Sequence, residues 1–186
     1  MVIKLITLFQ KEIEKIGGKA TKVNTLEELL EVIDKISLKN NSKIIAMTDL
    51  EIYGESIEEY LTTKGLKIIK TESTNIEIIK EADIGITLAD IGISDSGTIG
   101  ISFERNVELA VSSLPYIHIV ILNSKNLVKN LFDAYEYIND NIKKNNRRTI
   151  SLISGPSKTA DVEQILIKGV HGPNELHVII IESEFE

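Results

Sequence analysis

The chain has 186 residues, of which 42% are hydrophobic and 26% are charged. Its length and ordinary globular composition predict a single domain, 1–186, on which a helix at about 3–17 packs as an appendage. The formal net charge of −7 disfavours binding to nucleic acid, because phosphate backbones are anionic. The absence of cysteine excludes disulfides, thiolate zinc sites and cysteine-ligated iron–sulfur clusters in this chain.

In chain order, segments of helical periodicity alternate with short β-branched runs. The first ten residues are apolar but have neither a signal cleavage site nor a membrane-spanning length, which predicts a cytoplasmic protein with no membrane contact. The expected helices are 3–16, 24–37, 56–64, 75–81, 124–143 and 159–167. The expected strands are 43–47, 66–70, 84–88, 98–102, 116–122, 149–154 and 176–181. This alternation predicts an α/β fold, a three-layer α/β/α sandwich around a mainly parallel, Rossmann-like sheet.

Two polar segments interrupt this pattern, and the first is 82–100. Its turn Ser94-Asp95-Ser96-Gly97-Thr98 places one carboxylate and three hydroxyls around a glycine, and Asp90 forms the preceding turn. Such a group can hold an oxygen-rich ligand or present a reactive carboxylate. The same residue types are also ordinary in hairpin turns, so a purely structural role is the alternative.

The second segment is the loop Gly155-Pro156-Ser157-Lys158-Thr159 before an expected helix. The free N–H groups of a helix N-terminus bind anions, so this loop is a candidate cradle for a phosphate or carboxylate, with Asp161 in the first helical turn. The loop is not a Walker A motif, and no G-x-G-x-x-G follows a strand. A strand-to-helix transition of purely geometric origin is equally compatible with these residues.

Three histidines and one arginine complete the set of candidates. His118 and His177 lie within expected strands, which favours packing over ligation, whereas His171 beside Gly172-Pro173 lies in a loop and is a candidate acid or base. A hydrogen-bonded loop anchor is the alternative for His171. Arg105 is a candidate anion ligand or a partner in a surface salt bridge. No histidine spacing typical of a metal site is present.

These segments carry a resemblance over about the last hundred residues. The blocks 82–87, 95–98, 113–120, 154–164 and 169–178 resemble, in order and spacing, the lactate utilisation protein C family, which consists of a LUD domain. The resemblance implies the fold shared by ribose-phosphate isomerases, glucosamine-phosphate deaminases and CoA transferases. It also implies a role in oxidising L-lactate to pyruvate beside iron–sulfur partner proteins, which fits a chain without cysteine.

The turn at 94–98 departs from the family pattern. The family usually has Ala-Glu-Thr-Gly-Thr where this chain has Ser94-Asp95-Ser96-Gly97-Thr98, so the acid is kept but is one methylene shorter. The same run resembles the Ser-Glu-Asn-Gly motif of CoA transferases, whose glutamate forms an acyl-CoA thioester. This second resemblance implies that Asp95 lies at the corresponding corner of the fold.

Three functions follow as hypotheses. The first is a lactate-utilisation subunit that works with iron–sulfur partners, the second is an enzyme acting on a CoA ester or sugar phosphate, and the third is a non-catalytic assembly protein. The expected crevice lies between the 89–98 turns, the 155–159 loop and the His171 loop, and its ligand is a small anion. The expected catalytic residues are Asp95 and His171. The expected ligand-binding residues are Asp90, Ser96, Gly97, Thr98, Arg105, Gly155, Pro156, Ser157, Lys158, Thr159 and Asp161. No motif names a cofactor, and a homo-oligomer is compatible with the sequence.

Overall fold

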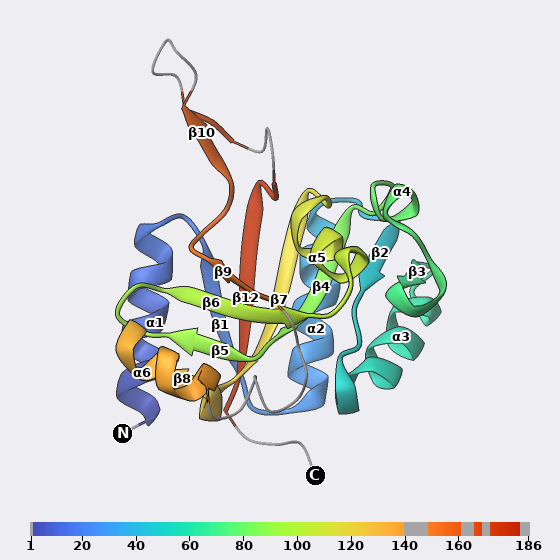
Figure 1. Cartoon of the computed structure of the whole chain (residues 1–186). Coiled ribbons are helices and arrows are strands. Elements are labelled where there is room, and N and C mark those ends of the chain that lie inside the picture. Colours follow the sequence, from blue (N-terminus) through green and yellow to red (C-terminus); the bar gives the residue numbers. More distant parts are fainter. Residues whose placement is uncertain (1, 140–148, 161–165, 169–171, 183–186) are drawn as a thin grey trace.

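The computed structural model describes residues 2–139, 149–160, 166–168 and 172–182 (Figure 1). Six parallel strands form the central sheet in the order β1-β12-β7-β4-β2-β3. Their bounds are β1 Lys19–Val23, β2 Ile44–Met47, β3 Lys67–Lys70, β4 Ile84–Ala89, β7 Ile117–Asn123 and β12 Glu175–Ile181. The central strands are continuous apolar runs because helices or a second sheet cover both of their faces.

One face of the sheet is covered by two helices, α2 (Leu26–Lys39) and α3 (Gly54–Thr63). Thr25 caps α2, since its side chain accepts a hydrogen bond from the backbone of Glu28, as the capping pattern predicts. Apolar side chains on one side of α2 and α3 pack against every second residue of the strands, among them Ile117, Ile119 and Ile121 of β7.

The opposite face is covered by α1 (Val2–Lys15), α4 (Ile76–Ile79), α5 (Asn106–Ser113) and a second sheet in the order β8-β5-β6-β9. That sheet contains β5 Ile91–Ile93, β6 Thr98–Phe103, β8 Leu127–Val128 and β9 Thr149–Ile153, and Figure 1 shows β5 and β6 crossing in front of the parallel strands. In α1, the helix expected to be an appendage, Ile6, Phe9 and Ile13 are buried in the same cluster as residues of β6, β7 and β12. The predicted three-layer α/β arrangement is confirmed.

Short elements connect these layers. They are the 3-10 turns η1 (Glu51–Tyr53), η2 (Thr71–Ser73) and η3 (Ser124–Asn126), the helix α6 (Leu131–Tyr137) and the hairpin strands β10 (Lys158–Ala160) and β11 (Leu166–Lys168). The helix expected at 124–143 is therefore shorter than predicted at its start, because η3 and β8 precede α6. Within the described residues, no helix is both long and apolar enough to cross a membrane.

The helix expected at 159–167 is wrong. The described parts of this segment, β10 and β11, pair as an antiparallel hairpin. The loop before β10 is held in an extended course by tertiary contacts: Ser157 donates its backbone N–H to the carbonyl of Pro173, and the Lys158 ammonium donates to the carbonyl of Ile16. These long-range bonds outweigh the local helical preference of the sequence.

Two glycines allow elements to approach closely. A Cβ on Gly85 of β4 would lie 1.9 Å from the carbonyl oxygen of Val111, so the backbone of α5 rests directly on the central strand. Gly97 has a φ of +63°, and its Cβ would lie 2.4 Å from the backbone nitrogen of Ile13. The turn at 94–97 therefore packs on α1 with no space for a side chain.

Candidate functional site

The strand order places a topological switch point between β2 and β4. The chain leaves β2 for α3 on one face of the sheet, and it leaves the neighbouring strand β4 for β5 and β6 on the other face. Connections that diverge in this way open a crevice at the carboxyl ends of the two strands, which is where open α/β sheets bind ligands.

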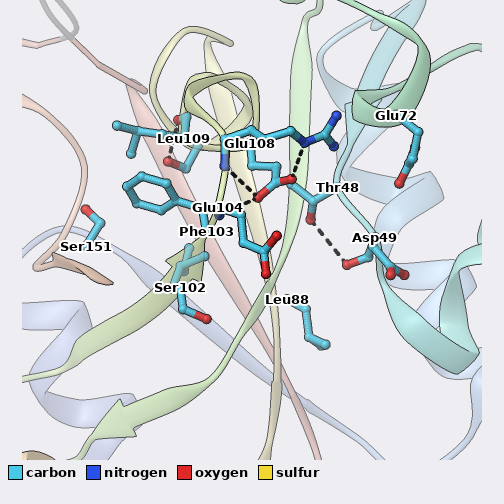
Figure 2. Close-up of a pocket in the computed structure, with 13 residues that line it drawn as sticks. Thr48, Asp49, Glu72, Leu88, Ser102, Phe103, Glu104, Glu108, Leu109 and Ser151 are labelled. Carbon is cyan, nitrogen blue, oxygen red and sulfur yellow. Dashed lines mark hydrogen bonds and ion pairs between the residues drawn. The ribbon is translucent and has the colours of Figure 1, made fainter. Parts of the chain in front are cut away.

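A cavity of about 340 Å³ lies at this position, within the size range of small-molecule sites. It is lined by Thr48 and Asp49 after β2, Glu72 after β3, Leu88 of β4, the end of β6 with the residues that follow it, α5, and Ser151 of β9 (Figure 2). The lining residues from the end of β6 and from α5 are Ile101, Ser102, Phe103, Glu104, Arg105, Glu108, Leu109 and Ser112. We call this cavity the switch-point cleft.

Glu108 and Arg105 form an ion pair at the N-terminus of α5. One oxygen of Glu108 accepts the Arg105 Nε–H at 3.0 Å, and the other accepts the backbone N–H of Glu104 at 3.0 Å. Arg105 Nη1 also donates to the carbonyl of Thr71 at 3.4 Å. A guanidinium carries five N–H groups, so these two contacts leave further donors for a ligand. Arg105 thus lines the switch-point cleft in a defined orientation.

Asp90, a predicted ligand-binding residue, forms two hydrogen bonds with Ser102, a residue that lines the cleft. Its Oδ2 accepts the backbone N–H of Ser102 at 2.6 Å and the Ser102 hydroxyl at 2.8 Å. Ser102 lines the cleft. The carboxylate of Asp90 therefore orients the Ser102 hydroxyl.

A second cavity of about 360 Å³ adjoins the first and shares Thr48, Asp49 and Glu72 with it. It is lined further by η1, the start of α3 and Lys70 at the end of β3. Lys70 forms an ion pair with Glu58, and this hydrogen bond raises the pKa of the lysine. The charges of Lys70 and Arg105 are thus each paired with a carboxylate of the protein, but the guanidinium of Arg105 has N–H groups beyond those that bind Glu108 and Thr71.

The turn predicted to be catalytic lies away from the cleft. Asp95 and Ser96 are exposed, and the backbone N–H of Asp95 donates to the carbonyl of Lys129. The Thr98 hydroxyl lies 2.9 Å from that of Ser96 and 2.7 Å from that of Ser154, which links the turn to the end of β9. These hydroxyls bond to one another beside α1.

The loop from Gly155 to Lys158 lies against the C-terminal end of α1. Gly155, with a φ of +80°, packs on the carbonyl of Ile16, and Lys158 donates to that same oxygen at 2.7 Å. The predicted helix N-terminus is absent, since Thr159 belongs to β10. The backbone of Ser157 bonds to Pro173 just before β12, so the loop, including Pro156, lies at the amino edge of the central sheet. His171 and Asp161 fall outside the described residues.

The structure thus divides the predicted site into two parts. Ser96, Gly97 and Thr98 lie at the start of β6, whereas Arg105 follows the end of this strand. Five residue steps from Thr98 to Phe103 correspond to about 17 Å of strand. Among the predicted ligand-binding residues, Arg105 lines the switch-point cleft and Asp90 supports it through Ser102.

The two described histidines lie within strands, as predicted. His118 is fully buried, its Nε2 lies 2.8 Å from the Thr87 hydroxyl, and burial lowers its pKa to about 3. His177 lies 2.8 Å from Glu175, and burial lowers the pKa of His177. Hydrogen bonds from Lys19 and His177 lower the pKa of Glu175 to about 2. Neither imidazole lines the cleft.

Sequence reasoning missed most of the cleft. The residues it did not single out include Thr48, Asp49, Glu72, Glu104, Glu108, Ser112 and Ser151. A signal was present, because Thr48-Asp49 directly follows the strand predicted at 43–47, and polar residues at the carboxyl ends of parallel strands are common ligand contacts. The sheet order that brings these segments together was not visible in the sequence.

The fold and the cleft define the class of protein: an α/β protein with a mainly parallel sheet and a polar crevice at its switch point. The family model described as the LUD domain matches residues 6–181, and the chain belongs to this family.

Similar proteins support this assignment. The chain is 28% identical over 168 residues to "Lactate utilization protein C" of Macrococcus caseolyticus, which covers 89% of this chain and 71% of the relative. It is 30% identical over 187 residues to the protein of that name in Halalkalibacterium halodurans, covering 97% and 80%. The crystal structure of a DUF162 family protein from Deinococcus radiodurans has the same fold, with a TM-score of 0.72, 23% identity and coverage of 98% and 99%. The resemblance seen in the sequence is confirmed.

Proposed function

We propose that this protein serves lactate utilisation as a subunit that binds a small carboxylate metabolite in the switch-point cleft, while iron–sulfur partner proteins carry the electrons. The names of its relatives support the pathway. The absence of cysteine supports the division of labour, because this chain offers no thiolate ligands for a cluster.

The observation that carries the ligand assignment is the orientation of Arg105 beside a cavity of suitable size. Arg105 is the only basic residue among the described residues that line the switch-point cleft. A planar guanidinium suits a carboxylate, since it can donate two parallel hydrogen bonds. The acids around it are Asp49, Glu72, Glu104 and its ion-pair partner Glu108, and they oppose a second negative charge, so the ligand is a monoanion held at Arg105.

Ligand binding to the isolated chain tests the location. L-lactate near 100 times its Kd is expected to raise the free energy of unfolding by about 2.7 kcal/mol. Arg105→Met is expected to abolish this stabilisation, and Lys11→Met, which removes an exposed charge on α1, is expected to keep it. Loss of stabilisation in Lys158→Met instead would place the ligand at the amino edge of the sheet.

Affinity purification from the native cells tests the partnership. We expect an iron–sulfur protein to co-elute with the chain and the eluate to oxidise L-lactate. Full lactate oxidation by the isolated chain, or recovery of the chain without any iron–sulfur protein, would contradict the proposed role.

A further inference from the structure

We propose that two copies of this chain associate through α6, in a two-fold symmetric dimer in which the two α6 helices pack antiparallel. The switch-point cleft takes no part in this association, because no residue of α6 lines either cavity. Two features of α6 point to a second copy: the apolar side chains on its outer side and the charges at its two ends.

The inner side of α6 is anchored to the second sheet. Asn130 fixes the start of the helix, since its side chain accepts the backbone N–H of Asp133 at 3.0 Å. Ala134 is buried against Ile91 and Ile93 of β5. Figure 1 shows α6 on the side of this sheet that faces away from the parallel strands. The direction of the outer side of the helix is therefore defined.

The outer side of α6 is an apolar patch. Leu131, Phe132 and Tyr135 expose 61%, 71% and 64% of their surface. They lie at positions i, i+1 and i+4, which share one side of a helix. Exposed hydrophobic residues that occur singly need no partner, whereas adjacent ones mark an interaction surface. Aromatic residues are also enriched in the buried centre of protein interfaces.

The charges of this region favour a second copy as the occupant. The segment 124–137 contains two lysines and two acids and is neutral, whereas the whole chain has a net charge of −7. Two copies therefore repel each other less through this segment than through the acidic remainder of the surface. Lys129 before the helix and Glu136 near its end are exposed, and neither forms an ion pair within the described residues.

Antiparallel packing brings these opposite charges together. In a two-fold symmetric interface, each contact of one residue with another occurs twice. Lys129 and Glu136 are seven positions apart, which is about 10 Å along a helix axis. Lys129 of each copy then lies beside Glu136 of the other, and Phe132 of each copy meets Tyr135 of the other at the centre. Parallel packing would instead place like charges together.

The expected dimer is reversible because the interface is small. α6 has seven residues, so it is about 10 Å long. Two helices of this length bury less than the roughly 1,200 Å² at which interfaces of standard size begin. We therefore expect a Kd in the micromolar range.

Sedimentation equilibrium of the purified chain over a range of concentrations tests the association. The mass is expected to rise from 20.7 kDa towards twice this value as the concentration increases. Phe132→Gln is expected to raise the Kd about tenfold or more, because a central aromatic contact is lost. Leu38→Gln is the matched control: Leu38 is 69% exposed on α2, and its substitution is expected to leave the Kd unchanged.

Charge reversal tests the antiparallel arrangement. Lys129→Glu and Glu136→Lys are each expected to weaken self-association, because each places like charges side by side. An equal mixture of the two variants is expected to associate more tightly than either variant alone, since opposite charges then face each other at both ends of the helix pair. A mixture that associates no more tightly than the separate variants would overturn the antiparallel arrangement.

Two further outcomes would overturn the inference. One is a mass that stays at the monomer value at every concentration, and this includes the case in which Phe132→Gln abolishes co-elution of a different protein, because the patch then serves that partner. The other is a dimer whose Kd is unchanged in Phe132→Gln, because its interface then lies elsewhere. Neither outcome affects the proposed function, which depends on ligand binding in the cleft.

Discussion

His118 is an ionisable side chain whose pKa is changed by burial in the protein interior. It lies in β7 with no exposed surface, and its one hydrogen bond among the described residues joins Nε2 to the hydroxyl of Thr87. Burial disfavours the imidazolium form and lowers the pKa to about 3. His118 is therefore neutral in the folded protein at all pH values near neutrality.

This pKa predicts a loss of stability in acid. Above pH about 6.5 the imidazole is neutral in both the folded and the unfolded chain and contributes no pH dependence. Between pH 6.5 and about 3 the unfolded chain binds a proton that the folded chain excludes, so stability falls as the pH falls. The expected contribution is about 1.4 kcal/mol per pH unit, measured by urea unfolding from pH 7 to pH 5.

His118→Gln removes this contribution and leaves a side chain that can bond to Thr87. We expect the variant to lose less stability than the unchanged protein between pH 7 and pH 5. His177→Gln is the comparison, because burial lowers the pKa of His177 in the same direction but this side chain also contacts Glu175. A slope in His118→Gln equal to that of the unchanged protein would show that the folded state accepts the proton.

The close approach of Gly97 to α1 predicts that a side chain at this position lowers the free energy of unfolding. Gly97→Ala combines a left-handed backbone with a clash against Ile13, and we expect a loss of about 3 kcal/mol in the free energy of unfolding. Gly65 is the control, since its φ is +82° but its Cβ would meet nothing within 4 Å. Gly65→Ala is expected to cost about 1 kcal/mol. If Gly97→Ala and Gly65→Ala lowered the free energy of unfolding equally in urea, the turn would not be in close contact with the helix.

At the scale of elements, the 155–158 loop acts as a cap for α1. Lys158 places its ammonium on the carbonyl of Ile16, at the end of the helix where the dipole is negative. Lys158→Met is expected to lower the free energy of unfolding by about 0.5–1 kcal/mol and to leave binding of L-lactate unchanged. Unfolding and calorimetry of the same preparation separate the two effects. Weaker binding with unchanged stability would contradict the capping role.

The strands could be predicted where their apolar runs were continuous. The expected strands 43–47, 66–70 and 84–88 agree within a residue with β2, β3 and β4, because each is a β-branched run bounded by turn residues. β1 was missed, since Lys-Ala-Thr-Lys-Val at the edge of the sheet has few apolar residues. Its strand conformation comes from pairing with β12, the last strand of the chain.

The site could be predicted only in part for a related reason. Asp90 was predicted as a turn residue after a strand and Arg105 as a candidate anion ligand or salt-bridge partner, and both lie at or beside the cleft. The lining residues come from five separate segments, 48–49, 72, 88, 101–112 and 151, whose proximity depends on the order of the strands. Local patterns carry no information on that order, so the sequence favoured compact motifs such as 155–159 over dispersed contacts.

At the scale of the whole molecule, the two sheets share one apolar cluster. Ile13 of α1, Ile99 of β6 and Val178 of β12 belong to it, so the second sheet is packed into the main core, although Ile91 and Ile93 of β5 form a further small cluster with Ala134 of α6. We therefore expect one cooperative unfolding transition, in line with a single domain. Circular dichroism and tyrosine fluorescence are expected to give the same midpoint.

Ile13→Ala tests this cooperativity. Ile13 is fully buried, and its truncation is expected to cost about 2–5 kcal/mol while the transition remains single. Leu38→Ala, on the exposed side of α2, is expected to change stability by less than about 0.5 kcal/mol. Two separate transitions in Ile13→Ala would show that α1 and the second sheet form an independent unit.

The contact between Gly85 and the carbonyl of Val111 makes the cleft mechanically asymmetric. It fixes α5 against the central strand β4. The side of the cleft that carries Glu104 and Arg105 therefore cannot move outward without breaking that packing. The opposite side of the cleft is formed by the connection from Thr48 to η1, in which Glu51 has a φ of +53°. We therefore expect this connection, and not α5, to move when a larger metabolite binds.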